Sequence, residues 1–415
     1  MGAEDDMMSY DAKKGLGDRM NIHILNADGG IIKACQSIGA SEENIRKINK
    51  IEQGEPAVGE EILGLLPTRS YQVAYGDTPE RIAMRFSIKK RDLLLSNPWL
   101  ATRDLRVGEN IALRYDERRH GMKVANGYFH DGCDEDKLRI AMPFLTYVTF
   151  SSAVADRHGI RRIMKDKDQV RLVTEAGKIP LIKVHDCYSD RFVAAGDIDG
   201  FAESLTAFAT DGGYRGIVLN STAFSHSAKE YMTFIMKMRK LMIGCDLILI
   251  TEVDENSPVE FSEYADGSIV YYPKFAMDNP PSFEDGERRV LADFACRGES
   301  AKAFVDLSCL ARCPGGFCPI EEALEYARAR RLTITKNEST LLSHFSDKKQ
   351  GGYTFGSLSG LRAIFDLIFE FDYMGICFDI MRVPISYLMM YNAMFKTCYQ
   401  SGVRSREEYS HEGAE

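Results

Sequence analysis

The feature that most constrains this chain is an alternation of short apolar runs with longer amphipathic stretches over residues 122–400. The runs have the length and composition of buried strands, and the stretches between several of them are long enough to form helices. Eight strands with intervening helices predict a (β/α)8 barrel, in which functional residues lie at the C-terminal ends of the strands. An open doubly wound sheet is the alternative, but no glycine-rich phosphate loop follows the first strand. The expected strands are 124–129, 147–151, 180–184, 216–219, 246–250, 269–272, 303–307 and 374–380, and the expected helices are 166–176, 198–211, 227–241, 284–297 and 320–330.

An internal repeat precedes the predicted barrel. Two copies of one supersecondary unit indicate two small modules, because a solenoid needs more repeats than two. We expect the modules at 20–67 and 70–116, after a disordered leader at 1–19. A shift of 49 positions places Asp28 on Asp77, Ala34 on Ala83, Val58-Gly59 on Val107-Gly108 and Ile62 on Ile111.

The second copy predicts the order strand, helix, helix, strand. Alternating apolar residues over 71–75 indicate a strand with one buried face, and Thr78 followed by Pro79 is typical of a helix start. A second short helix ends at Asn97-Pro98, and a strand follows at 111–113.

The segments GDTPERIA, NPWL and LRVGENIAL resemble a LysM module, in this order and at matching spacing. The resemblance implies binding of N-acetylglucosamine-containing glycans, namely peptidoglycan or chitin. The alternative is structural: Thr78 only caps a helix, Pro98 only stops one, and Trp99 belongs to the core. The first copy departs further from the pattern, which puts its glycan binding in doubt. The residues that the resemblance implies as glycan contacts are Gly76, Asp77, Thr78, Asn97, Pro98 and Trp99.

The barrel region resembles glycoside hydrolase family 18, and within it the spore-cortex N-acetylglucosaminidases with N-terminal LysM repeats. ANGYFHDG and LTYVTFSSAVADRHG are similar to the first two strands of that family, and GYRGIVLNSTAF falls on its fourth-strand catalytic motif. IVYYPKF falls on the sixth strand and MGICFDIMRVP on the last. The resemblance implies hydrolysis that is assisted by the acetamido group of the substrate, with a glutamic acid as proton donor.

The residues that carry this chemistry in the family are replaced here. The three aspartate positions of the motif hold Arg215, Val218 and Asn220, and the glutamic acid position holds Thr222. A threonine hydroxyl is no general acid near neutral pH. Asp379 stands where the family places a tryptophan under the sugar. The sequence therefore predicts a barrel that has lost the standard chemistry of the family.

A relocated acid is the open alternative. Asp186, Glu252, Asp254 and Asp379 all follow or end predicted strands. Such a carboxyl group acquires a raised pKa when it is buried at a barrel mouth. The structural interpretation is that these acids are solvated or pair with Lys183, Arg215 or Arg382, and we expect Arg215 as the partner of Asp379. The residues expected to line the cleft are Tyr128, Phe150, Asn220, Thr222, Tyr271, Tyr272 and Asp379.

Composition limits the other classes of function. Lys and Arg total 52 against 61 for Asp and Glu, and the resulting net charge of −9 argues against a general nucleic-acid binder. No uninterrupted run of about 18 apolar residues is present, so no membrane span is expected. No metal or other cofactor is expected. Three cysteines, Cys309, Cys313 and Cys318, lack the spacing of a zinc site, and His185, Asp186 and His226 form no paired-histidine motif.

The N-terminal residues are polar and acidic, unlike a secretory signal. We therefore expect synthesis in the cytoplasm, with cysteines that are reduced and a disordered tail at 401–415. The resemblance implies later deposition on a spore or cell wall. Three hypotheses follow: a glycan-binding protein with a catalytically degenerate barrel, an active N-acetylglucosaminidase with a relocated carboxylate, and a scaffold whose barrel binds a spore or envelope protein.

Overall fold

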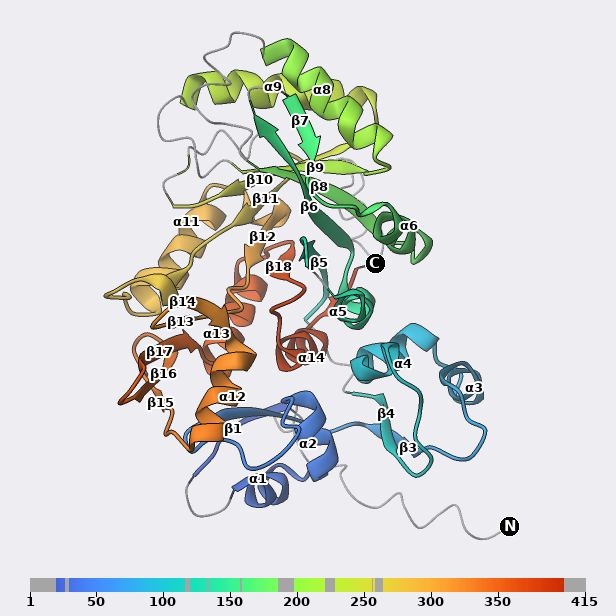
Figure 1. The fold of residues 1–415 in the computed structure, drawn as a ribbon, viewed down its shortest axis with the longest axis vertical. Coiled ribbons are helices and arrows are strands. Elements are labelled where there is room, and N and C mark those ends of the chain that lie inside the picture. The colour runs from blue at the N-terminus through green and yellow to red at the C-terminus, as the bar shows by residue number, and fades with distance from the viewer. Residues whose placement is uncertain are drawn as a thin grey trace.

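The barrel predicted for residues 122–400 is present and closed (Figure 1). The computed structural model describes residues 20–26, 30–115, 120–132, 134–156, 159–185, 198–220, 228–255, 257 and 264–398. The last barrel strand pairs with the first, and the first pairs with the second, so the open-sheet alternative is excluded. The eight parallel strands are β5 (Met122–Phe129), β6 (Tyr147–Asp156), β8 (Ile179–His185), β9 (Gly216–Asn220), β10 (Ile248–Val253), β11 (Gly267–Val270), β12 (Ala303–Asp306) and β18 (Gly375–Asp379).

Alternation along each strand separates two apolar layers. Tyr147 of β6 packs in a small cluster inside the barrel, whereas Val148 joins the large cluster between strands and helices. The inner cluster takes one buried residue from each strand and Met374 from just before β18, because successive side chains on a strand point to opposite faces. Its buried members are Val124, Tyr147, Leu181, Val218, Ile250, Ile269, Phe304, Met374 and Cys377.

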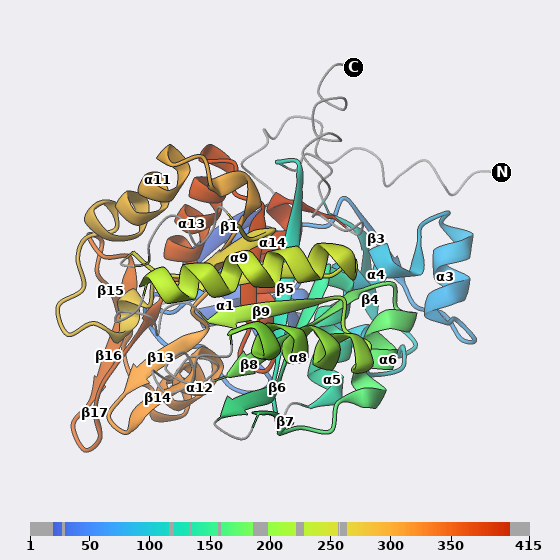
Figure 2. The same ribbon diagram turned by 90° about the horizontal axis from the view of Figure 1, so that it is seen from above.

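Helices cover the outside of the barrel. In α8, Phe201, Leu205 and Ala209 are buried at a spacing of four residues, which turns one apolar face toward the strands. α8 and α9 lie side by side (Figure 2), and the rings of Phe201 and Phe234 stack with centroids 5.5 Å apart. The helices are α5 (Glu135–Ala141), α6 (Lys167–Glu175), α8 (Ile198–Asp211), α9 (Ala228–Gly244), α11 (Arg289–Cys296), α13 (Leu358–Glu370) and α14 (Ile385–Met394).

An insertion between β12 and α13 was not predicted from the sequence. The helix expected at 320–330 is α12 (Ile320–Arg330), but it packs with a separate antiparallel sheet rather than with the barrel. The helix itself is confirmed, whereas its place in an insertion was not expected, because the short strands around it carry too few apolar residues to stand out in the sequence. The sheet contains β13 (Leu310–Cys313), β14 (Gly316–Pro319), β15 (Thr335–Lys336), β16 (Leu342–Asp347) and β17 (Gly351–Gly356). Two short strands extend the barrel sheet, β7 (Gly159–Arg162) and β19 (Lys396–Thr397).

The two N-terminal copies each form a strand, two helices and a second strand that pairs antiparallel with the first. Gly59 and Gly108, which the repeat makes equivalent, both adopt a left-handed backbone with φ of 80° and 85°. The first copy comprises β1 (Met20–Ile24), α1 (Gly30–Ile38), α2 (Glu42–Ile48) and β2 (Glu61–Leu65), and the second comprises β3 (Arg69–Gln72), α3 (Pro79–Arg85), α4 (Lys90–Ser96) and β4 (Asn110–Arg114). We call them module 1 and module 2.

The strand predicted at 71–75 is shorter than expected. β3 ends at Gln72, and Tyr75 is 95% exposed because it lies in the turn that leads to α3. Val73 is buried as predicted. Apolar alternation alone therefore placed the end of this strand too late.

Both modules share a core with the barrel. Leu65 of module 1 and Leu95 of module 2 belong to the same buried cluster as Phe144 and Leu388 of the barrel. The Asn392 side chain on α14 donates a hydrogen bond to the Leu95 carbonyl at 3.2 Å. The modules are thus docked on the barrel rather than tethered to it.

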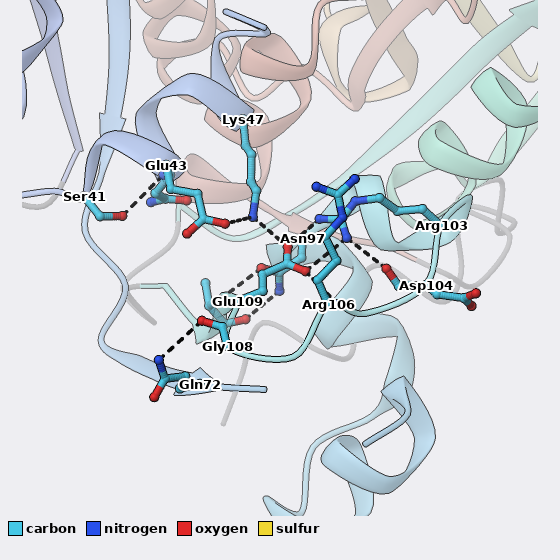
Figure 3. Close-up of polar contacts among 12 residues, drawn as sticks. Ser41, Glu43, Lys47, Gln72, Asn97, Arg103, Asp104, Arg106, Gly108 and Glu109 are labelled. Carbon is cyan, nitrogen blue, oxygen red and sulfur yellow. Dashed lines mark hydrogen bonds and ion pairs between the residues drawn. The ribbon is translucent and has the colours of Figure 1, made fainter. Parts of the chain in front are cut away.

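Buried charges join the modules to each other and to the insertion. Glu109 of module 2 accepts hydrogen bonds from Lys47 of module 1, at 2.6 Å, and from Arg103 (Figure 3). Burial raises the pKa of Glu109, but these hydrogen bonds outweigh it and hold the pKa at about 2. Arg328 of α12 donates to both oxygens of Glu60 in module 1, at 2.6 and 3.1 Å, and Glu60 is 2% exposed.

The repeat provides a matched pair of glycines that tests the docking of module 1. A Cβ at Gly59 would lie 1.8 Å from the carbonyl oxygen of Ile334 in the insertion, whereas a Cβ at Gly108 would meet no atom within 4 Å. Both substitutions by alanine incur the left-handed backbone cost of about 1 kcal/mol. We expect Gly59→Ala to lower the free energy of unfolding in urea clearly more than Gly108→Ala. Equal effects would contradict the close contact between Gly59 and Ile334.

Candidate functional site

A cavity of about 300 Å³ opens at the C-terminal ends of the barrel strands. Its polar side chains come from strands far apart in the sequence and lie within the last three residues of β5, β8, β10, β12 and β18. This is the end at which (β/α)8 barrels carry their functional residues. We call this cavity the mouth; its polar and aromatic lining includes Tyr128, Lys183, Glu252, Tyr271, Asp306, Asp379 and Arg382.

Glu252 is the most engaged acid in the mouth. The Lys183 ammonium donates to its Oε1 at 2.6 Å, and the Tyr128 hydroxyl donates to the same oxygen. Lys183 also lies 5.0 Å from the centre of the Tyr128 ring. Glu252 is opposite Asn220 in the β9–β10 register, so this relocated-acid candidate lies next to the end of the fourth strand.

Asp379 lies beside His130 and pairs with Arg382, one of the expected cations. His130 Nε2 lies 3.1 Å from one carboxylate oxygen, and Arg382 lies 3.3 Å away. The prediction that Arg215 pairs with Asp379 was wrong. Arg215 immediately precedes β9 and therefore lies at the opposite end of the barrel. The alternative partner Arg382 is confirmed.

Asp306 is a third acid of the mouth and was not predicted from the sequence. It is the last residue of β12 and lines the mouth. Burial, together with the nearby charge of Glu252, raises its pKa to about 7, although Lys183 opposes the shift. The available signal was its position at the end of the predicted strand 303–307, the same criterion that selected Asp379.

Most of the other predicted mouth residues are elsewhere. Tyr128 and Tyr271 line the mouth, as expected. The prediction that Phe150 lines the mouth was wrong. Phe150 is 0% exposed and packs against Phe129 and Tyr214 in the layer outside the barrel. Tyr272 lines an adjacent cavity of about 70 Å³.

The remaining candidates do not line the mouth in the described part of the chain. Asp254 forms a turn with Ser257, and Asn220 ends β9. Asp186, Thr222 and His226 lie outside the described residues.

The turn of module 2 presents two of the three predicted glycan contacts. Gly76 and Thr78 are exposed. Thr78 accepts a hydrogen bond from the Arg81 amide at 3.2 Å, which confirms that it caps α3. The Asp77 carboxylate turns inward and accepts from the Tyr71 hydroxyl at 2.7 Å, so it mainly holds the turn.

The loop after α4 is largely structural. The buried Asn97 side chain accepts from the Ala112 amide at 3.0 Å and donates back to the Ala112 carbonyl, which corrects its expected contact with a glycan. Pro98 is buried as well. Trp99 is half-buried, packs on module 2 and on the main core, and has the Lys47 ammonium 5.4 Å from its ring.

The described residues contain no group of three or more His, Cys, Asp or Glu side chains that could hold a metal ion. Cys309 is buried beside the mouth, while Cys313 and Cys318 lie on the β13–β14 hairpin. None of the helices in the described ranges is long and apolar enough to span a membrane.

No family model and no curated protein matches the sequence. Among solved structures, the closed parallel barrel is the fold of spore cortex-lytic enzymes and chitinases. SleL, the spore cortex-lytic enzyme of Bacillus megaterium QM B1551, has a TM-score of 0.70 at 15% identity, over 92% of this chain and 99% of that chain. SleL of Bacillus cereus gives 0.69 at 16%, over 92% and 100%. A class V chitinase from Nicotiana tobaccum, solved with NAG4, gives 0.56 at 11%, over 66% and 99%.

Proposed function

We propose that this protein binds N-acetylglucosamine-containing glycans, peptidoglycan or chitin, in the mouth of its barrel. The observation that carries the proposal is the mouth itself, an open cavity with two tyrosines and hydrogen-bonding groups at the functional end of the barrel. A structurally similar chitinase was solved with NAG4, and spore cortex-lytic enzymes share the fold. The same likeness supports a spore or cell-wall setting.

The proposed binding does not involve the catalytic acid that is standard in family 18. β9 is the fourth strand of the barrel, and the sequence similar to the catalytic motif lies on it and on the residues that follow. Val218 fills the barrel interior where the motif has an aspartate, and position 222 is threonine. Binding in the mouth therefore relies on other side chains than those of the family motif.

Module 2 is proposed as a LysM module that adds a second glycan contact. Gly76, Thr78 and Trp99 are the residues that its structure leaves available for this contact, since the side chains of Asn97 and Pro98 are buried. Module 1 has the same order of elements, and we assign it no glycan contact. A scaffold that binds a spore or envelope protein is less well supported, because the mouth is open rather than filled.

Substitution of Tyr271 tests the proposed binding. Its ring lines the mouth and is 41% exposed, so it can stack on a sugar. We expect Tyr271→Ala to weaken the affinity for chitin oligomers about tenfold in isothermal titration calorimetry. Tyr264→Ala is the control, since Tyr264 is also exposed but does not line the mouth. Unchanged affinity in Tyr271→Ala, or no binding by the unmodified protein, would refute glycan binding in the mouth.

Hydrolysis by a relocated carboxylate is the second candidate function. The specific observation is that three acids, Glu252, Asp306 and Asp379, line one cavity. Glycoside hydrolysis generally uses one carboxylic acid and one carboxylate. Mass spectrometry of products from the unmodified protein, incubated with peptidoglycan and with chitin oligomers, tests this function alongside binding.

A further inference from the structure

The three acids of the mouth differ in what surrounds them. Glu252 accepts from Lys183 at 2.6 Å and from Tyr128, and Asp379 pairs with His130 at 3.1 Å and with Arg382 at 3.3 Å. Glu252 and Asp379 therefore each have a cation, Lys183 and Arg382 respectively, within ion-pair distance.

Asp306 has no such partner. Within the part of the chain that the structure describes, its carboxyl group accepts no hydrogen bond and forms no ion pair. It is held at the end of β12, where the Leu307 amide donates to the Cys377 carbonyl of β18 at 2.7 Å, and it lines the mouth. A carboxyl group that is largely removed from water, lies beside another carboxylate and has no cation in direct contact favours its protonated form.

We infer that Asp306 is the proton donor of a glycosidic-bond cleavage in the mouth, with Glu252 as the fixed carboxylate. This inference rests on the proposed binding of N-acetylglucosamine glycans there. The protonated Asp306 gives its proton to the bridging oxygen while the bond from that oxygen to the anomeric carbon breaks. Glu252 stabilises the positive charge that develops on the sugar. The hydroxyl of a water molecule then joins the anomeric carbon, and the remaining proton of the water returns to the Asp306 carboxylate.

The groups around Asp306 set the pH dependence of this step. Asp306 keeps its proton up to about pH 7, so its ability to donate falls as the pH rises above that value. The charged neighbours are Lys183, Glu252 and Asp379, with Arg382 further along the wall. Burial raises the pKa of the neighbouring hydroxyl and thiol groups, which are Tyr128, Tyr271, Cys309 and Cys377.

The test measures binding and cleavage on the same samples. Unmodified protein, Asp306→Asn, Asp306→Glu and the exposed control Asp293→Asn are incubated with chitin oligomers and with peptidoglycan from pH 4 to 9. We expect product release by the unmodified protein and by Asp293→Asn to decline above about pH 7. Loss of a general acid lowers rates by about 10²–10⁴-fold, so Asp306→Asn should lose at least 100-fold with unchanged affinity, and Asp306→Glu should recover part of the rate.

Three results would overturn the inference. Undiminished cleavage by Asp306→Asn would place the acid elsewhere, and a tenfold or greater loss in Asp293→Asn would make the effect nonspecific. Binding without products from the unmodified protein at any pH would also overturn it, but would leave the proposed binding function intact. Absence of binding by the unmodified protein would instead refute the proposed function itself.

Discussion

Replacement of Asp306 by asparagine should raise the free energy of unfolding at pH 8 and leave it unchanged at pH 4. The Asp306 pKa is about 7 in the folded protein and 3.8 for an ordinary aspartate. At pH values between these two pKa values, the unfolded chain releases a proton that the folded chain retains. The carboxyl group therefore destabilises the fold increasingly as the pH rises toward 7. At about 1.4 kcal/mol per unit, the loss reaches at most about 4 kcal/mol. Asparagine has the same shape and carries no such penalty.

Urea unfolding at the two pH values measures this effect. The control is Asp293→Asn on the exposed side of α11, for which we expect the same small change at both pH values. If Asp306→Asn is less stable than the unmodified protein at pH 8, the carboxyl group contributes to the fold and the pKa assignment is wrong. A variant that gains stability while it loses cleavage would show that Asp306 is retained for function at the expense of stability.

Replacement of Arg328 by methionine should lower the free energy of unfolding by about 3–5 kcal/mol. The substitution Arg328→Met leaves the carboxylate of Glu60 buried without its cation, and this is the costly way to break a buried ion pair. Arg328 also donates to the carbonyls of Asn49 and Lys50 at 3.2 and 3.0 Å, so module 1 loses several contacts with the insertion at once.

The matched control is Arg139→Met. Arg139 pairs with Glu135 on the surface of α5 with both side chains more than 40% exposed, and such pairs contribute at most about 1 kcal/mol. Calorimetry separates two forms of the result for Arg328→Met: a single transition at lower temperature, or an early transition of module 1 followed by the barrel. A loss of stability in Arg328→Met no larger than the loss in the Arg139→Met control would contradict the role of Arg328 in docking.

All eight barrel strands could be predicted from the sequence, because each carries a run of apolar residues that is buried on both faces. The helix at 320–330 could be predicted but its place in an insertion could not, because amphipathicity shows that a helix has a buried face but not what that face packs against. Phe150 was placed in the mouth because the apolar run of β6 does not show which face of the strand points inward. A shift of one residue reverses that choice.

The special character of Asp306 is not visible in its own segment. Its surroundings come from β8, β10 and β18, which lie more than 50 residues away from it along the chain. Barrel closure brings these strands together, and only then does an ordinary strand-end aspartate lie beside two other carboxylates with no cation in direct contact. The position was predictable, whereas the environment required the structure.

The docking of the two modules has a consequence for how a long polymer would meet this protein. A domain on a loose linker searches a volume, and each encounter then costs the entropy of fixing its orientation. Here Glu60, Glu109 and the shared core fix that orientation when the chain folds. Module 2 and the mouth therefore stand at one constant separation and angle. A polymer can contact both only if its length and curvature match this fixed arrangement. The protein would therefore discriminate between polymers by their shape.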